Sequence, residues 1–252
     1  MEQIFGLILA ICFGAIFGSY ATLFAYRLPR AESCFGRYFG QKSRCPKCGF
    51  ILRTRDLIPL LNWLLTLGKC KNCGSKIPKT HLFVELSTTT IFTIFYLKFS
   101  FSQEFILYSL IGVGVVIALV CDYTHKFLPQ QILLFILMIC VAERVLRDGN
   151  VVDVVFSSAV GVFFATIFYQ IFYKKTNGLF ASQGQSLDYT KFILISSVHF
   201  SVTSFILYFT AVMAIFTSIL LFNIPTKKNR NNFAYVLLVP FLWLIIFYPI
   251  SK

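Results

Sequence analysis

The chain has 252 residues, of which 57% are hydrophobic and 13% are charged, and its mean hydropathy is +0.75. This composition excludes an ordinary soluble domain. Its formal net charge is +13, and nothing in the sequence resembles a stacking groove or a recognition helix, so we assign the excess charge to cytoplasmic loops and expect no nucleic-acid partner. Apolar runs recur, and a bilayer leaves their backbone groups without water. The composition therefore predicts an all-α polytopic membrane protein.

The first predicted span covers residues 4–26. The three residues before it carry no positive charge and the apolar run is long for a signal peptide, so we expect a retained helix with the N-terminus outside. A basic segment follows, at about residues 27–80, with 12 of the 23 Lys and Arg against two acids, Glu32 and Asp56. An excess of Lys and Arg beside a span marks the cytoplasmic side.

Further spans are predicted at residues 82–97, 105–121, 131–145 and 151–173, and a last one at residues 233–250. As one helix, residues 192–222 would be about 46 Å long, against a hydrocarbon core of about 30 Å. One crossing there would also put the basic residues 227–230 outside, so we predict two short spans with a turn near residue 207. The total is about eight transmembrane helices, and Asp122 and Asp188 then fall at one membrane face.

Four cysteines in the basic segment have the spacing of a metal site. Cys45 and Cys48 form one C-x2-C pair, Cys70 and Cys73 form another, and 21 residues separate the pairs. Two such pairs supply four thiolates for a tetrahedral Zn²⁺. Ordinary buried thiols are disfavoured because each pair carries Gly and Lys in knuckle-like positions, and disulfides because the cytoplasm is reducing. We therefore predict a structural zinc ion in a small zinc-ribbon-like segment.

Three of the ten acids, Asp122, Asp188 and Glu85, lie near the predicted cytoplasmic boundary. A carboxylate close to hydrocarbon is costly and is a candidate functional group. Two carboxylates at one depth can share a proton, so that one takes a proton from water while the other protonates a carbonyl oxygen or a leaving amine. That is the chemistry of aspartic proteolysis. An aspartate at a helix end that is merely interfacial is the alternative.

Three motifs carry a family resemblance. FGSYATLFAYRLPR (residues 17–30) is similar to a G-S-F-x-N-x-x-x-x-R-x-P block, and residues 45–86 match a cytoplasmic zinc segment that includes Ile-Pro-Leu-Leu and ends near Glu85. DYTHKFLP matches a block with Asp followed by Leu-Pro or Ile-Pro six and seven residues later. The chain thus resembles the type IV prepilin peptidases, bifunctional leader peptidases and N-methyltransferases of the GxGD-type aspartic protease family. The resemblance implies that Asp122 is the first catalytic aspartate.

The second catalytic block departs from the family pattern, G-x-G-D followed by x-K-[LF]. GQSLDYTKF has Gln185 and Leu187 where the family has glycines, and Lys191 stands one position late. Asp188 is the only acid in this expected loop, so the resemblance implies that it is the second catalytic residue. Thr22 replaces the Asn of the opening block, which leaves open whether the methyl-donor contacts are retained.

The resemblance implies three regions: a first transmembrane helix at 1–26, a cytoplasmic zinc-binding segment associated with methyl transfer at 27–81, and a transmembrane aspartic peptidase domain at 82–252. The enzyme would cleave the leader of a type IV prepilin or pseudopilin after a Gly and methylate the new N-terminal amine with S-adenosylmethionine. Glu85 is the candidate for that methylation site, and a buried partner for Arg or Lys is its alternative role. The expected location is the bacterial inner membrane, among membrane lipids, with the active site at the cytoplasmic face.

Two other functions stay open on the sequence. One is a peptidase without methyl transfer, as in archaeal-type preflagellin peptidases, which generally lack the zinc segment. The other is a non-enzymatic membrane assembly protein that docks partners through a zinc ribbon. The second predicts that Asp122→Asn and Asp188→Asn are silent.

Overall fold

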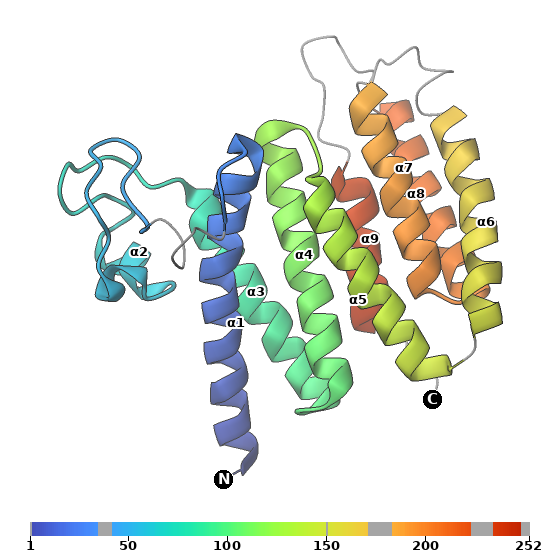
Figure 1. Cartoon of the computed structure of the whole chain (residues 1–252), viewed down its shortest axis with the longest axis horizontal. Helices are drawn as coiled ribbons and strands as arrows, with labels where there is room; N and C mark the ends of the chain where they lie inside the picture. Colours follow the sequence, from blue (N-terminus) through green and yellow to red (C-terminus); the bar gives the residue numbers. More distant parts are fainter. Residues whose placement is uncertain (1, 35–41, 150, 171–182, 223–233, 248–252) are drawn as a thin grey trace. The chain divides into compact units, whose positions relative to one another are not determined.

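The computed structural model describes the chain except for residues 1, 35–41, 150, 171–182, 223–233 and 248–252 (Figure 1). The described residues form helices and two isolated β-bridges, with no β-strand among them. Packing divides the chain into two compact units, Met1–Val120 and Cys121–Lys252. This division follows contacts alone and does not test the functional regions expected at 1–26, 27–81 and 82–252, which stay predictions.

The first unit holds α1 (Glu2–Arg27), α2 (Leu61–Leu65), α3 (Lys79–Phe99) and most of α4 (Gln103–His125). The second holds the end of α4 with α5 (Gln130–Asp148), α6 (Val151–Tyr169), α7 (Gln183–His199), α8 (Val202–Phe222) and α9 (Ala234–Phe247). Four helical segments among the described residues are long and apolar enough to cross a membrane: Glu2–Arg30, Lys79–Phe99, Gln103–His125 and Val152–Tyr169. The helical class is confirmed, whereas eight crossings stay a prediction.

In the first unit, α1 packs closely against α3 through small side chains. The buried small residues of α1 recur at intervals of three or four: Gly6, Ala10, Gly14, Gly18, Ala21 and Ala25. A Cβ on Gly14 would lie 2.7 Å from the Cα of Thr89, and one on Gly18 would lie 2.8 Å from the Cα of Glu85. Small residues let two backbones approach in this way inside a bilayer. The contact fixes the part of α3 that carries Glu85.

In the second unit, α7 contacts α5, α6 and α9 and supplies much of the core. The Phe192 ring on α7 meets the Phe241 ring on α9 edge-on, with the centroids 5.1 Å apart. A Cβ on Gly161 of α6 would lie 2.0 Å from the Oγ of Ser197 on α7, so these two helices are also in close contact. Because α7 also carries Asp188, its position in the core fixes that aspartate.

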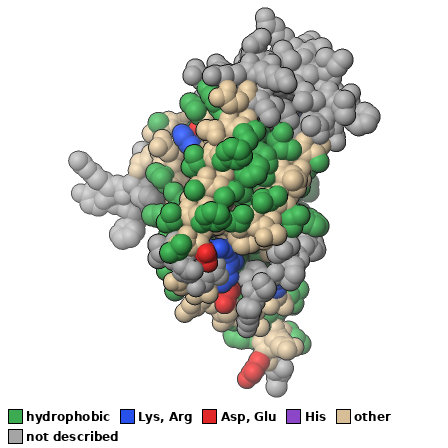
Figure 2. Space-filling model, turned by 90° about the vertical axis from the view of Figure 1, so that its right-hand side faces the viewer, with side chains coloured by type: hydrophobic (Ala, Val, Ile, Leu, Met, Phe, Trp, Pro, Cys, Tyr) green, Lys and Arg blue, Asp and Glu red, His purple; other side chains and the backbone are tan. Residues whose placement is uncertain are grey.

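The surface on the α6 side is largely hydrophobic, and the charged atoms in this view lie mainly toward its lower end (Figure 2). The exposed apolar residues of α6 include Val152, Val155, Phe156, Val162 and Phe163. An apolar face of this kind on a helix long enough to cross a bilayer is suited to contact with lipid.

Two expectations about the second unit are wrong in position. The turn predicted near residue 207 lies at Phe200 and Ser201, and α8 runs unbroken through residue 207. Ser201 occupies the N-cap position of α8, where Ser is favoured, and its carbonyl accepts the Phe205 N–H at 2.8 Å. Asp188, expected in a loop, lies in the second turn of α7. The basic residues 227–230, on which the predicted turn relied, lie outside the described residues.

Candidate functional site

The two C-x2-C pairs form matching knuckles in the backbone. The Gly49 N–H donates to the Cys45 carbonyl and the Gly74 N–H donates to the Cys70 carbonyl, each at 2.9 Å. Both glycines have positive φ, +71° and +67°, which side chains other than glycine rarely adopt. The glycine after each pair is therefore required by the knuckle and explains the repeat seen in the sequence.

The four predicted metal-ligating sulfurs converge on one point. All lie within 4.8 Å of one another, with Cys45 Sγ 3.9 Å from Cys73 Sγ and Cys48 Sγ 4.0 Å from Cys70 Sγ. A tetrahedral zinc ion with Zn–S bonds of about 2.3 Å sets its sulfurs about 3.8 Å apart. The donors therefore fit Zn²⁺, and a site with four thiolates leaves no open coordination position for substrate.

Hydrogen bonds favour the thiolate form of two of the four cysteines, Cys45 and Cys73. The backbone N–H of Cys48 and the hydroxyl of Ser75 lower the pKa of Cys45 to about 6. The Ser75 hydroxyl lies 3.6 Å from Cys45 Sγ and 3.1 Å from Cys73 Sγ, and it lowers the pKa of Cys73 as well. A metal ligand must be deprotonated, so these contacts prepare two of the four sulfurs to bind a cation.

Glu85 anchors the loop that carries the Ile-Pro-Leu-Leu run. Its Oε2 atom accepts the backbone N–H of Leu60 at 2.7 Å. Leu60 has φ +60°, a conformation uncommon for a residue with a side chain, and this contact helps to hold it. The partner seen for Glu85 is thus a backbone amide instead of the Arg or Lys considered from the sequence, while its role toward a methyl donor stays a prediction.

Asp122 is buried in the last turn of α4, with 1% of the residue exposed. The hydroxyl of Tyr189 on α7 donates to Asp122 Oδ1 at 2.9 Å, and Tyr189 is also 1% exposed. Tyr189 directly follows Asp188 in the chain, so this hydrogen bond joins the two predicted catalytic blocks. Sequence reasoning missed Tyr189, although its helical spacing from the apolar residues Phe192 and Ile193 marks it as part of a buried face.

Asp188 is more accessible, with 18% of its side chain exposed. Its Oδ1 atom lies 3.3 Å from the Nζ of Lys191, three residues later on the same helix. Residues three apart face the same side of a helix, so the displaced lysine still reaches the aspartate. The structure therefore gives a physical role to the lysine that stands one position late in the sequence pattern.

Comparison with known proteins finds similarity to prepilin leader peptidases. Residues 12–99 match the family model described as the bacterial peptidase A24 N-terminal domain. A prepilin leader peptidase/N-methyltransferase of Vibrio cholerae is 33% identical over 172 residues, which cover 66% of each chain. A Bacillus subtilis protein of the same name is 31% identical over 134 residues, or 53% of this chain and 52% of its own.

The chain belongs to the type IV prepilin peptidase family. An Escherichia coli relative named type 4 prepilin-like proteins leader peptide-processing enzyme is 30% identical over 137 residues, which cover 51% of its length. The matched regions thus span half to two thirds of these relatives. No solved structure matches.

The family model covers the four cysteines and Glu85 of this prepilin peptidase homologue, but it ends before Asp122 and Asp188. The geometry of the two aspartates is therefore independent of that match. It places them on helices that meet through Tyr189, and it leaves their catalytic roles as a proposal.

A second group of buried charges lies at the other end of α5 and α7 in this family member. Glu143 Oε1 lies 3.0 Å from an Arg147 guanidinium nitrogen, and Glu143 Oε2 lies 3.1 Å from His199 Nδ1. Arg147 also donates to the His199 carbonyl at 3.1 Å. Glu143 and His199 are both buried, with 2% of each residue exposed. This cluster joins α5 to α7 about 16 Å along α7 from Asp188.

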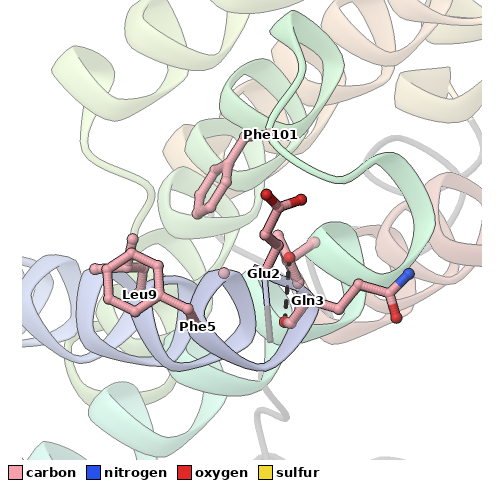
Figure 3. Close-up of a pocket in the computed structure, with 7 residues that line it drawn as sticks. Glu2, Gln3, Phe5, Leu9 and Phe101 are labelled. Atoms are coloured by element: carbon pink, nitrogen blue, oxygen red, sulfur yellow. Dashed lines mark hydrogen bonds between the residues drawn. The ribbon is translucent and has the colours of Figure 1, made fainter.

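A groove in the first unit lies at the N-terminal end of α1 (Figure 3). Its lining residues are Glu2, Gln3, Phe5, Gly6, Leu9, Tyr96 and Phe101. The Tyr96 hydroxyl donates to the Gln3 carbonyl at 3.4 Å across the α1–α3 contact. The segment that holds the four cysteines begins after the opposite end of α1, so this groove takes no part in the candidate site.

Proposed function

We propose that this chain is an inner-membrane aspartic peptidase that removes the leader from type IV prepilins or pseudopilins after a Gly. The observation that carries the proposal is the 2.9 Å hydrogen bond from Tyr189 to Asp122, because it brings the turn that bears Asp188 to the end of α4. The family of the chain supports the same reaction, since relatives are named prepilin leader peptidases.

In the proposed reaction, the two carboxyl groups share one proton. The ionised carboxylate takes a proton from a water molecule, whose oxygen attacks the scissile carbonyl carbon, while the protonated carboxyl gives its proton to the carbonyl oxygen. The tetrahedral intermediate then breaks its C–N bond: the carboxyl group that took the proton from water gives it to the leaving amine, and the former carbonyl oxygen returns its proton to the other carboxylate. Tyr189, fully within the core, would hold the Asp122 carboxylate in one orientation through both steps.

The proposed topology has eight crossings, with the N-terminus outside. Counting α1, α3 and α4 as crossings returns the chain to the cytoplasmic side at Asp122, and α5 and α6 return it there again before Asp188. The 12 basic residues between α1 and α3 support the same orientation. Both carboxylates would then meet the substrate where its hydrophobic helix leaves the inner leaflet and water is available.

We propose that the same chain methylates the freed N-terminal amine, as the names of its relatives indicate. Zn²⁺, held by Cys45, Cys48, Cys70 and Cys73, would supply a structural cross-link to the basic segment. S-adenosylmethionine would supply the methyl group. Glu85 is the candidate residue for the methylation site. Its Oε2 atom accepts the Leu60 N–H, which holds the loop of residues 57–60 beside it.

Co-expression with a prepilin tests both parts. Asp122→Ala and Asp188→Ala should each abolish leader removal, while Asp153→Ala, an exposed acid at the start of α6, should leave it intact. Unchanged processing in both aspartate variants would end the peptidase proposal and favour the non-enzymatic assembly role. The mass of the mature pilin should rise by one methyl group; a mature pilin with an unmodified amine would leave a peptidase without methyl transfer.

A further inference from the structure

The zinc segment exposes an unusual number of large aliphatic side chains. We define the leucine cluster as Leu57, Ile58, Leu61, Leu64, Leu65 and Leu67. Exposed fractions in this cluster run from 40% for Leu57 to 81% for Leu65. A contiguous exposed apolar patch marks a surface that contacts a partner or a membrane.

The backbone on either side of α2 adopts an uncommon conformation. Leu60 and Leu67, on either side of α2, have φ of +60° and +50°. Positive φ is strained for residues with a side chain, and such strain persists only where the surroundings hold it. The Trp63 ring lies so close to Gly68 that a Cβ there would be 2.8 Å from its Cζ2 atom. The tryptophan thus packs against Gly68, whereas the leucines remain exposed.

Among the described side chains of residues 42–79 the exposed charges are all positive, and the half-buried Glu85 of α3 accepts the Leu60 N–H beside the cluster. Between residues 42 and 79 the single acid is Asp56, which is buried and lies 2.5 Å from the Lys71 Nζ atom. The exposed bases of this stretch are Lys42, Arg44, Lys47, Arg53, Lys69, Lys71, Lys76 and Lys79. Apolar side chains among exposed bases are the pattern of an element that lies in an anionic membrane interface.

The Leu60–Glu85 hydrogen bond holds the leucine cluster beside the second turn of α3. Glu85 lies six residues after Lys79, where α3 begins, which corresponds to about 9 Å along the helix axis. The Leu60 N–H reaches that second turn at 2.7 Å, so the chain folds back beside the apolar span. In Figure 1, α2 lies beside the upper half of α1 and below the end from which the segment departs.

We propose that the leucine cluster inserts into the anionic surface of the membrane that α1 and α3 cross, as an interfacial anchor for the zinc segment. Its leucines enter the boundary between headgroups and acyl chains, and the surrounding lysines and arginines meet the lipid phosphates. A basic peptide is a weaker candidate for this surface, because the exposed charges of residues 42–79 repel it. The anchor concerns this surface alone, so it stands or falls independently of the proposed peptidase.

The test uses the full chain in vesicles of phosphatidylcholine and phosphatidylglycerol, with brominated acyl chains as quenchers. Trp63→Phe and Trp243→Phe remove the two native tryptophans, and Leu65→Trp then adds a single reporter. Lys47→Trp, at the exposed tip of the first knuckle, is the matched control. Brominated lipid should quench the reporter at position 65 several-fold more than the one at position 47, and aqueous iodide should show the reverse. Vesicles without phosphatidylglycerol should reduce the difference.

Equal iodide quenching at both positions, with no quenching by brominated lipid, would overturn the anchor. Protection of position 65 that appears only after a prepilin is added would also overturn it and assign the surface to substrate. Hydrogen exchange of the unaltered chain avoids the substitutions. Residues 57–67 should exchange more slowly in vesicles with phosphatidylglycerol than in vesicles of phosphatidylcholine alone, and equal exchange would contradict the proposal.

Discussion

The hydroxyl of Tyr189 donates a 2.9 Å hydrogen bond to Asp122, and both residues are almost fully buried. This contact joins the end of α4 to the second turn of α7, across 67 positions of sequence. Since Asp188 is the residue before Tyr189, the contact limits how far the two acidic turns can separate. It gives the proposed catalytic pair a fixed frame within the second unit.

Replacing Tyr189 with Phe removes this hydrogen bond and keeps the ring. A hydrogen bond to a charged group contributes about 1.5–3 kcal/mol, so we expect kcat for leader removal to fall roughly tenfold or more, with a smaller change in KM. Tyr208→Phe is the matched control, because the buried Tyr208 hydroxyl donates to the Leu237 carbonyl instead. Equal losses in the two variants, measured per folded molecule, would indicate a general packing defect and contradict the positioning role.

The sequence predicted the features that depend on local spacing. Two C-x2-C pairs with a following glycine determine the knuckles, and a long apolar run determines α1, because both follow from a few adjacent residues. The start of α8 was misplaced because Ser201 is a single N-cap signal inside an apolar stretch. A cap of this kind can be identified from sequence, but here the division of residues 192–222 into two spans of similar length was given more weight.

The contacts that the sequence did not reveal join distant segments. Tyr189 with Asp122, Glu85 with Leu60, and Glu143 with His199 each depend on which helix faces which. Periodicity identifies the buried face of a helix but does not identify its neighbour. The polar partner of a buried carboxylate therefore became visible only in the folded chain.

Two substitutions at Glu85 separate its structural role from a catalytic one. Glu85→Gln keeps an oxygen acceptor for the Leu60 N–H, whereas Glu85→Ala removes it. We expect Glu85→Ala to destabilise the zinc segment by about 1 kcal/mol, because the Leu60 amide loses its partner, and Glu85→Gln to change it little. Limited proteolysis of residues 57–67 reports the difference. If Glu85→Gln also abolishes methylation without loosening the loop, the carboxylate charge acts on the methylation reaction itself.

Each zinc ion that binds should release fewer protons than the four cysteines that ligate it. At about pH 7.5 a thiol with its pKa held near 6 is already a thiolate, and Cys45 is such a thiol. Metal binding to the metal-free chain should therefore release fewer than four protons, as measured by calorimetry in buffers of different ionisation enthalpy. Ser75→Ala removes a hydroxyl that lowers the pKa of Cys45 and Cys73, so it should raise the proton release. Release of four protons by the unaltered chain would contradict the prediction.

The close contact of α1 with α3 leaves no room for even one methyl group at Gly14, so we expect Gly14→Ala to destabilise the chain. The added Cβ would lie 2.7 Å from the Thr89 Cα, a backbone atom, so the two helices must separate. Forced overpacking of this kind costs about 1–3 kcal/mol, which unfolding in detergent would detect. Ile16→Phe enlarges a side chain that is 49% exposed on the same helix and should leave the stability unchanged. Equal stability of the two variants would contradict the tight α1–α3 contact.

The most direct test of the proposed catalytic pair is single-turnover cleavage of a prepilin by the purified, reconstituted chain. Asp122→Asn, Asp188→Asn and the double variant are compared with the unaltered protein. Because two carboxylates that share one proton act as a unit, we expect each single variant to lose more than about a thousandfold in rate and the double variant to lose no more. Leader cleavage at the unaltered rate in either single variant would contradict it.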